Sequence, residues 1–113
     1  MEISEHEVEF FNCHEIVSGG PEACSLMIDG QEIEGEKFDS TALPYKTGIL
    51  VPARKSNFFV FGYALCYIDF ATLNVKFVSK VLPYMKLLRI VGNNAEIKKS
   101  TYGNETKFIK IID

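Results

Sequence analysis

Two histidines and three cysteines are the side chains of this chain that could serve as bases, nucleophiles or metal ligands: His6, His14, Cys13, Cys24 and Cys66. A Cys–His nucleophile pair needs both side chains on one face. Cys13 and His14 are sequence neighbours, which would point to opposite faces of a strand. Zinc sites are typically built from spaced pairs of Cys and His ligands, and the sequence has no Cys-x-x-Cys. We therefore expect a protein that is not an enzyme and that holds no metal or other cofactor.

Carboxylates offer a different kind of chemistry, because six of them fall into two rows with a spacing of two residues. The rows are Glu5, Glu7 and Glu9, then Glu32, Glu34 and Glu36. Residues two apart on a strand share one face. Two such rows side by side would repel each other. A fold can tolerate them if the rows lie apart, if basic strands lie between them, or if the face is kept for a cationic partner. These six glutamates are the candidate partner-binding residues, and an ordinary solvated face is the alternative.

The acid with the most apolar surroundings in the sequence is Asp69. Paired-carboxylate catalysis would need a carboxylate in an apolar pocket. Thr72 and Asn74 follow Asp69 closely, as they would at a turn. We therefore predict that Asp69 caps a turn.

Cysteine usage and the N-terminus indicate the compartment. The first ten residues are acidic and lack a basic region followed by an apolar stretch, so we expect no signal peptide. An odd number of cysteines without a signal peptide favours free thiols in the cytoplasm. Cys66 lies in the most apolar run and should be buried. No run approaches the roughly 18–20 apolar residues of a membrane helix, so we expect no membrane partner.

The elements that would position these residues are strands. The chain has 113 residues, of which 47% are hydrophobic and 24% are charged, as in one globular domain over residues 1–113. Short runs of Val, Ile, Phe and Tyr between turn signals predict an all-β fold, an antiparallel sandwich or flattened barrel of about 8–9 short strands. The strands expected after the N-terminal segment are Cys24–Ile28, Glu32–Phe38, Gly48–Val51, Phe58–Asp69, Val75–Lys80, Lys86–Val91, Ala95–Lys99 and Thr106–Ile112. Asp29-Gly30 should close a hairpin, and Gly62 should mark a bulge or kink.

The first 17 residues fit two predictions. As one short helix, they would have Ser4 as the N-cap and Glu7 as its capping-box partner. As a strand, they would place Val8 and Phe10 on the face opposite the glutamates. The even alternation favours a strand.

Charge is divided unevenly along the chain. Residues 1–39 hold eleven of the 15 acids and one of the 12 bases, which leaves four acids and eleven bases for residues 40–113. This polarity could steer an oppositely charged partner, or the two halves could neutralise each other inside the fold. Basic and aromatic residues of the second half suit nucleic acid. A pI of about 5.4 and the acidic first third would repel phosphate, so nucleic acid is not the partner we expect.

In its small size, β-rich pattern, acidic docking residues and lack of an evident active site, the chain resembles the small cytoplasmic immunity proteins of bacterial contact-dependent and other polymorphic toxin systems. The resemblance implies a protein that binds a cognate toxin and blocks its substrate cleft. The basic cleft of a nuclease toxin would suit the two glutamate rows. Buried aromatic anchors would hold such a complex, and the candidates are Tyr45, Tyr84 and Tyr102.

Two other classes of function stay open at this point. One is a small apolar-ligand-binding β-barrel, because the aromatic-rich segment Phe58–Tyr67 could line a cavity. The other is a structural subunit that self-associates through a sheet edge. We rank a small molecule below a protein as the partner.

Overall fold

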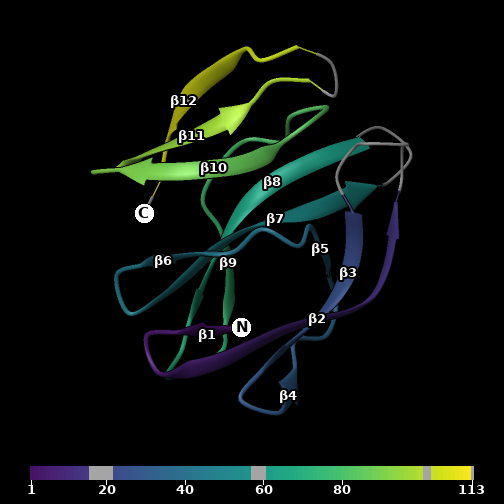
Figure 1. Ribbon diagram of the computed structural model, residues 1–113, viewed down its shortest axis with the longest axis vertical. Coiled ribbons are helices and arrows are strands. Elements are labelled where there is room, and N and C mark those ends of the chain that lie inside the picture. Colours follow the sequence, from purple (N-terminus) through teal and green to yellow (C-terminus); the bar gives the residue numbers. More distant parts are fainter. Residues whose placement is uncertain (16–21, 57–60, 101–102, 113) are drawn as a thin grey trace.

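Twelve strands and no helix make up the described part of the chain, which in this computed structural model covers residues 1–15, 22–56, 61–100 and 103–112 (Figure 1). All strand pairs are antiparallel, in one sheet of nine strands and one of three. The prediction of an all-β antiparallel fold is confirmed. Neither sheet closes into a barrel, so the flattened-barrel alternative is wrong. Within the described ranges there is also no helix long and apolar enough to cross a membrane.

The larger sheet contains the first nine strands. They are β1 (Glu2–Ile3), β2 (His6–Glu15), β3 (Glu22–Ile28), β4 (Gln31–Glu32), β5 (Lys37–Phe38), β6 (Leu43–Tyr45), β7 (Gly48–Ser56), β8 (Phe61–Asp69) and β9 (Val75–Phe77). Its main path runs β1-β2-β3-β5-β7-β8-β9, while β4 also pairs with β3 and β6 with β7. The smaller sheet has the order β10 (Lys86–Val91), β11 (Asn94–Lys98) and β12 (Thr106–Lys110).

The long central strands β7 and β8 are buried on both faces, because alternate side chains of a strand point to opposite sides. Ile49 and Val51 of β7 enter the first hydrophobic core, which the larger sheet encloses. Leu50 of β7 and Leu65 of β8 enter the second core, which the smaller sheet covers with residues such as Ile97. Figure 1 shows this smaller sheet at the end of the molecule away from β1 and β4. The nearly continuous apolar sequence of β7 and β8 therefore follows from their double burial.

The N-terminal segment is a strand, as the alternation predicts, and the helix alternative is wrong. Ser4 and Glu5 form the turn between β1 and β2, with φ angles of 50° and 70°, so Ser4 is not a helix N-cap. The Asp29-Gly30 hairpin is confirmed between β3 and β4. Its φ angles of 50° and 83° are both positive, as a two-residue type I′ turn requires.

The prediction of one continuous strand over Glu32–Phe38 is wrong, because a turn interrupts it. β4 ends and β5 begins within it, and a turn at Glu34-Gly35 separates the two strands. Gly35 has a φ of 93°, which glycine adopts without the steric cost of a Cβ. The alternation of glutamates across this turn imitates a strand pattern without a continuous strand.

β7 is longer than the expected strand Gly48–Val51 because it continues through Pro52. The Pro52 carbonyl accepts a hydrogen bond from the Asp39 amide at 2.9 Å, on the side of β7 that faces β5. The amide nitrogen of a strand residue points to the same side as its carbonyl. The missing N–H of Pro52 therefore removes no bond to β8, and β5 has only two residues to pair with on the other side.

The expected strand Phe58–Asp69 is present as β8, and its first three residues lie outside the described part of the chain. Gly62 is not a bulge, since the register with β7 is continuous and pairs it with Lys55. Instead, a Cβ at Gly62 would lie 2.2 Å from the Leu82 carbonyl oxygen. Glycine is needed here because the backbone of Leu82 passes so close.

A disulfide between Cys13 and Cys24 joins β2 to β3, with an S–S distance of 2.09 Å. The register of the two strands shifts between Phe11 and His14, so the bridge sits at a β-bulge. The expectation of three free thiols is wrong for this pair. Cys66 is free and buried, as predicted.

Candidate functional site

Strand register gathers four exposed glutamates on one face of the larger sheet. Glu2 pairs with Glu7 between β1 and β2. Glu9 of β2 and Glu32 of β4 flank Met27, which is the partner of both on β3. Glu7 and Glu9 share a face because they are two residues apart on one strand. Cross-strand partners also share a face, which adds Glu2 and Glu32. All four side chains are exposed and point away from the first core. We call these four glutamates the acidic face.

The acidic face has little internal compensation. Glu2 and Glu7 are direct cross-strand neighbours, an arrangement of like charges that destabilises a sheet. The amino group of Met1 offsets part of this, since its nitrogen lies 3.0 Å from Glu7 Oε1. No lysine, arginine or histidine of the described residues lies within ion-pair distance of Glu2, Glu9 or Glu32. The face therefore presents a negative potential to solvent.

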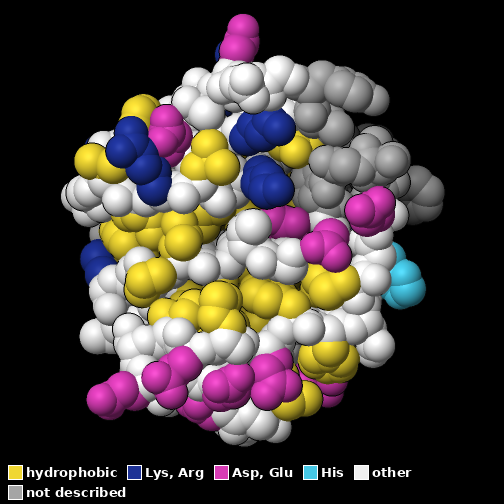
Figure 2. All heavy atoms as spheres, in the orientation of Figure 1, with side chains coloured by type: hydrophobic (Ala, Val, Ile, Leu, Met, Phe, Trp, Pro, Cys, Tyr) yellow, Lys and Arg dark blue, Asp and Glu magenta, His cyan; other side chains and the backbone are white. Residues whose placement is uncertain are grey.

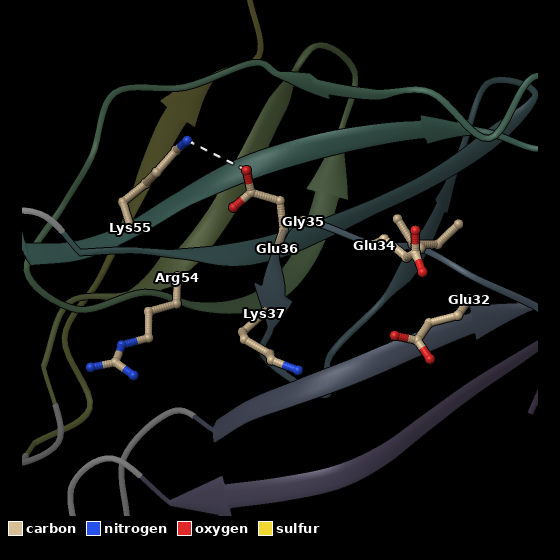
Figure 3. A pocket seen from close by; sticks show the side chains of 8 residues that line it. Glu32, Glu34, Gly35, Glu36, Lys37, Arg54 and Lys55 are labelled. Atoms are coloured by element: carbon tan, nitrogen blue, oxygen red, sulfur yellow. Dashed lines mark ion pairs between the residues drawn. The ribbon is translucent and has the colours of Figure 1, made fainter.

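The structure separates the six glutamates of the two predicted rows. Glu5 lies in the turn before β2, and Glu34 lies in the turn after β4. Glu36 is half-buried and forms an ion pair with Lys55, with 3.6 Å between Oε1 and Nζ (Figure 3). The other three predicted residues belong to the acidic face. Glu2 was not predicted, because a two-residue strand leaves no periodic pattern.

A concavity of about 710 Å³ borders the acidic face beyond β4 (Figure 3). Three acids and three bases line it: Glu32, Glu34, Glu36, Lys37, Arg54 and Lys55. Lys37 Nζ donates a hydrogen bond to Ser25 Oγ at 2.9 Å. Lys37 also pairs with Arg54 across β5 and β7. Lys37, Arg54 and Lys55 therefore bound the acidic face on the side of this concavity.

His6 and Asp29 form a histidine–carboxylate pair, with 2.6 Å between Nδ1 and Oδ2. Hydrogen bonds from His6 and from the Glu7 amide lower the pKa of Asp29. The His6 ring also stacks on Phe70 with centroids 4.0 Å apart, which ties β2 to the segment after β8. Ser4 and Thr47 line the same surface hollow as His6. The free thiol, Cys66, is buried, and burial raises its pKa, so it stays protonated and unreactive.

Asp69 caps the turn after β8, as predicted. Its Oδ1 accepts a hydrogen bond from the Ala71 amide at 2.8 Å, and its Oδ2 accepts one from Thr47 Oγ1 at 2.6 Å. The Thr47 and Ala71 bonds lower the pKa of Asp69 because they favour the charged carboxylate. This carboxylate therefore has a structural role.

Few ion pairs between described residues join the two halves of opposite charge. Among the ion pairs between described residues, only Lys55–Glu36 joins residues 1–39 to residues 40–113. Figure 2 shows a row of acidic side chains along the lower edge of this view, whereas its upper part carries basic side chains with acidic ones among them. The structure thus favours the reading in which the charge asymmetry is displayed to solvent.

Most of the described aromatic residues that were predicted to anchor a partner or line a cavity pack instead in or against the two hydrophobic cores. Tyr45 is buried in the second core, with its ring edge on Tyr67. Tyr84 is half-buried, and Tyr102 lies outside the described residues. In the described part of the segment Phe58–Tyr67, alternate side chains enter the two cores from β8, and the barrel of the small-ligand alternative is not formed.

No family model matches the chain, and comparisons with curated proteins and with solved structures likewise find no match. The acidic face and the separation of charge are therefore the features that bear on function.

Proposed function

We propose that this protein is a non-enzymatic inhibitor that binds a basic protein through the acidic face. The observation that carries the proposal is the placement of Glu2, Glu7, Glu9 and Glu32 on one side of β1, β2 and β4, where the Met1 amino group is the one cation among the described residues that pairs with them. Keeping like charges together costs stability. A cationic partner would offset that cost and would be steered to the face by its field.

The resemblance to immunity proteins suggests what the partner is. We propose a nuclease-type toxin domain, whose catalytic cleft is basic because it holds the phosphate backbone. The acidic face would cover that cleft and exclude the nucleic acid. Charge complementarity would mainly speed association, while better-packed contacts would set the lifetime of the complex.

A cytoplasmic location belongs to the same proposal, and the disulfide is the observation that weighs against it. Bonds such as Cys13–Cys24 persist mainly in oxidising compartments. Alkylation of free thiols in intact cells, followed by mass spectrometry, decides the question. Modified Cys13 supports a reducing location, and a blocked Cys13–Cys24 pair supports an oxidising one.

The test is a capture experiment with the full chain as bait and lysate of the source organism or purified candidate toxin domains as prey. Wild type is compared with the acidic-face variant, in which Glu7, Glu9 and Glu32 are changed to Gln. The matched control changes Glu5, Glu34 and Glu105 to Gln, which removes the same charge elsewhere on the exposed surface.

We expect wild type and the control variant each to capture one stoichiometric basic protein. We also expect that protein to have a nuclease activity, which wild type blocks. The acidic-face variant should bind it roughly 5- to 30-fold more weakly, as expected for three charge contacts. Equal binding by the acidic-face and control variants would remove the acidic face from the account.

A further inference from the structure

A second site, independent of the acidic face, lies along β12 at the other end of the molecule (Figure 1). A slot of about 280 Å³ separates this strand from the segment that follows β9. Its lining is mainly apolar and basic: Leu82, Ile109, Ile112, Lys80, Lys107 and Lys110. The slot therefore combines an apolar floor with three cations.

Along the edge that borders the slot, the backbone of β12 pairs with no strand of the described residues. In this antiparallel pair the Ile111 amide donates to the Asn93 carbonyl at 2.8 Å, so the odd-numbered residues of β12 bond to β11. The amide and carbonyl groups of Thr106, Phe108 and Lys110 consequently point away from β11. Among the described residues, none forms a backbone bond to these groups.

Just beyond β12, one backbone group on this side of the strand is already paired. The Ile112 amide, which points the same way, donates to the Val78 carbonyl at 2.8 Å. Beyond Val78 the chain turns from β12 toward β8, where Leu82 and Tyr63 exchange two backbone bonds of 2.8 Å. The slot opens where the segment after β9 diverges from β12. It therefore lies beside the unpaired edge of β12, where a further strand would pair.

The three lysines of the slot are available to an anion. Lys99, which directly follows β11, forms an ion pair with Glu105, with 3.6 Å between Nζ and Oε2. By contrast, no carboxylate of the described residues lies within ion-pair distance of Lys80, Lys107 or Lys110. Their charges add to those of a half of the chain that is already basic.

We propose that the slot binds an extended, acidic segment of a partner protein, which adds as a strand to the free edge of β12. Its backbone would pair with the outward groups of Thr106–Lys110, one apolar side chain would enter the slot beside Leu82 and Ile109, and flanking carboxylates would reach the lysines. A fatty acid offers the same charge and apolar surface but no amides. It would cover the strand edge without satisfying its polar groups, which is costly.

The probe is the peptide acetyl-Glu-Ile-Glu-Val-Glu-amide, titrated into the isotope-labelled full chain at low salt and followed by NMR and amide hydrogen exchange. We expect the amides of Thr106, Phe108 and Lys110 to shift and to gain protection from exchange. N-methylation of alternate peptide amides should weaken binding by roughly tenfold or more, because the strand bonds are lost. A peptide with Lys in place of Glu should not bind.

Two protein variants separate this site from the fold and from the acidic face. Changing Lys107 and Lys110 to Gln should weaken binding roughly fivefold, whereas changing Lys76 and Lys86 to Gln, which lie outside the slot, should not. The acidic-face variant should bind the peptide like wild type. The peptide site and the proposed function of the acidic face can therefore be refuted independently of each other. The inference is overturned by an absence of shifts along β12, by undiminished binding of the N-methylated peptide, or by octanoate binding there in place of the peptide.

Discussion

At the scale of single residues, Asp29 connects three parts of the molecule through one carboxylate. It bonds to the His6 ring and to the Glu7 amide, and His6 in turn stacks on Phe70. These hydrogen bonds lower the pKa of Asp29 relative to the unfolded chain. Their contribution to stability is therefore fully present above the ordinary pKa of an aspartate and is lost as the pH falls through the lowered pKa.

We expect the urea midpoint of wild type to fall between about pH 5 and about pH 2, and the Asp29→Asn variant to show a shallower fall. Asp69 and Glu96 also have lowered pKa values, so part of the acid sensitivity should persist in the variant. Parallel pH profiles for wild type and Asp29→Asn would contradict this role for Asp29.

Tyr63 provides a second test at this scale, because its hydroxyl is buried and has no hydrogen-bond partner among the described residues. Replacing Tyr63 with Phe removes an unsatisfied polar group and should leave the free energy of unfolding unchanged or raise it by up to about 1 kcal/mol. The control is Tyr67→Phe, which loses bonds to Thr47 and Asp69 and should lower that free energy by about 1 kcal/mol. Urea unfolding of both variants makes the comparison. A clear loss of stability in Tyr63→Phe would show that the hydroxyl has a partner after all.

At the scale of elements, the Cys13–Cys24 bridge is the one covalent link between strands in the described structure. Its sequence separation is 11. Closing such a loop should stabilise the fold by about 2–3 kcal/mol through the unfolded state. We expect Cys13→Ser, at an exposed position, to lose this amount in urea unfolding and to become insensitive to reductant. The same midpoint for wild type with and without reductant would mean that the bridge does not contribute.

Strand positions were predictable where a local pattern was enough. β10 has the expected bounds, Lys86–Val91, and the Asp29-Gly30 turn between β3 and β4 was correctly identified. The pattern failed over Glu32–Phe38, where the period of two continues across a turn. It also failed at Pro52, because the tolerance of a proline depends on which neighbour its missing N–H faces.

The candidate site depended on pairing between strands, which the sequence does not display. Glu7, Glu9 and Glu32 were identified, but their common face arises from the partners that β3 brings together. Glu2 joins them only through the register of β1 and β2. The disulfide was missed for the same reason, since the count of cysteines cannot show that Cys13 faces Cys24 across β2 and β3.

At the scale of the whole molecule, the two proposed binding surfaces lie at opposite ends and have opposite charge. The acidic face lies on β1, β2 and β4, and the basic slot lies beside β12. A single ion pair between described residues, Lys55–Glu36, crosses between the acidic and basic halves of the sequence. A partner that carries both a basic cleft and an acidic extended segment could engage both surfaces. The gain from such bivalent binding depends on the span between them.

The central claim, that the acidic face docks a basic partner, is tested most directly by the association rate with the captured partner as a function of salt. Wild type and the control variant should associate fast at low salt and slow steeply as salt is added, since salt screens exposed charges. The acidic-face variant should associate more slowly at low salt and show a flatter salt dependence. The same rate and the same salt dependence for the acidic-face variant and wild type would contradict the account.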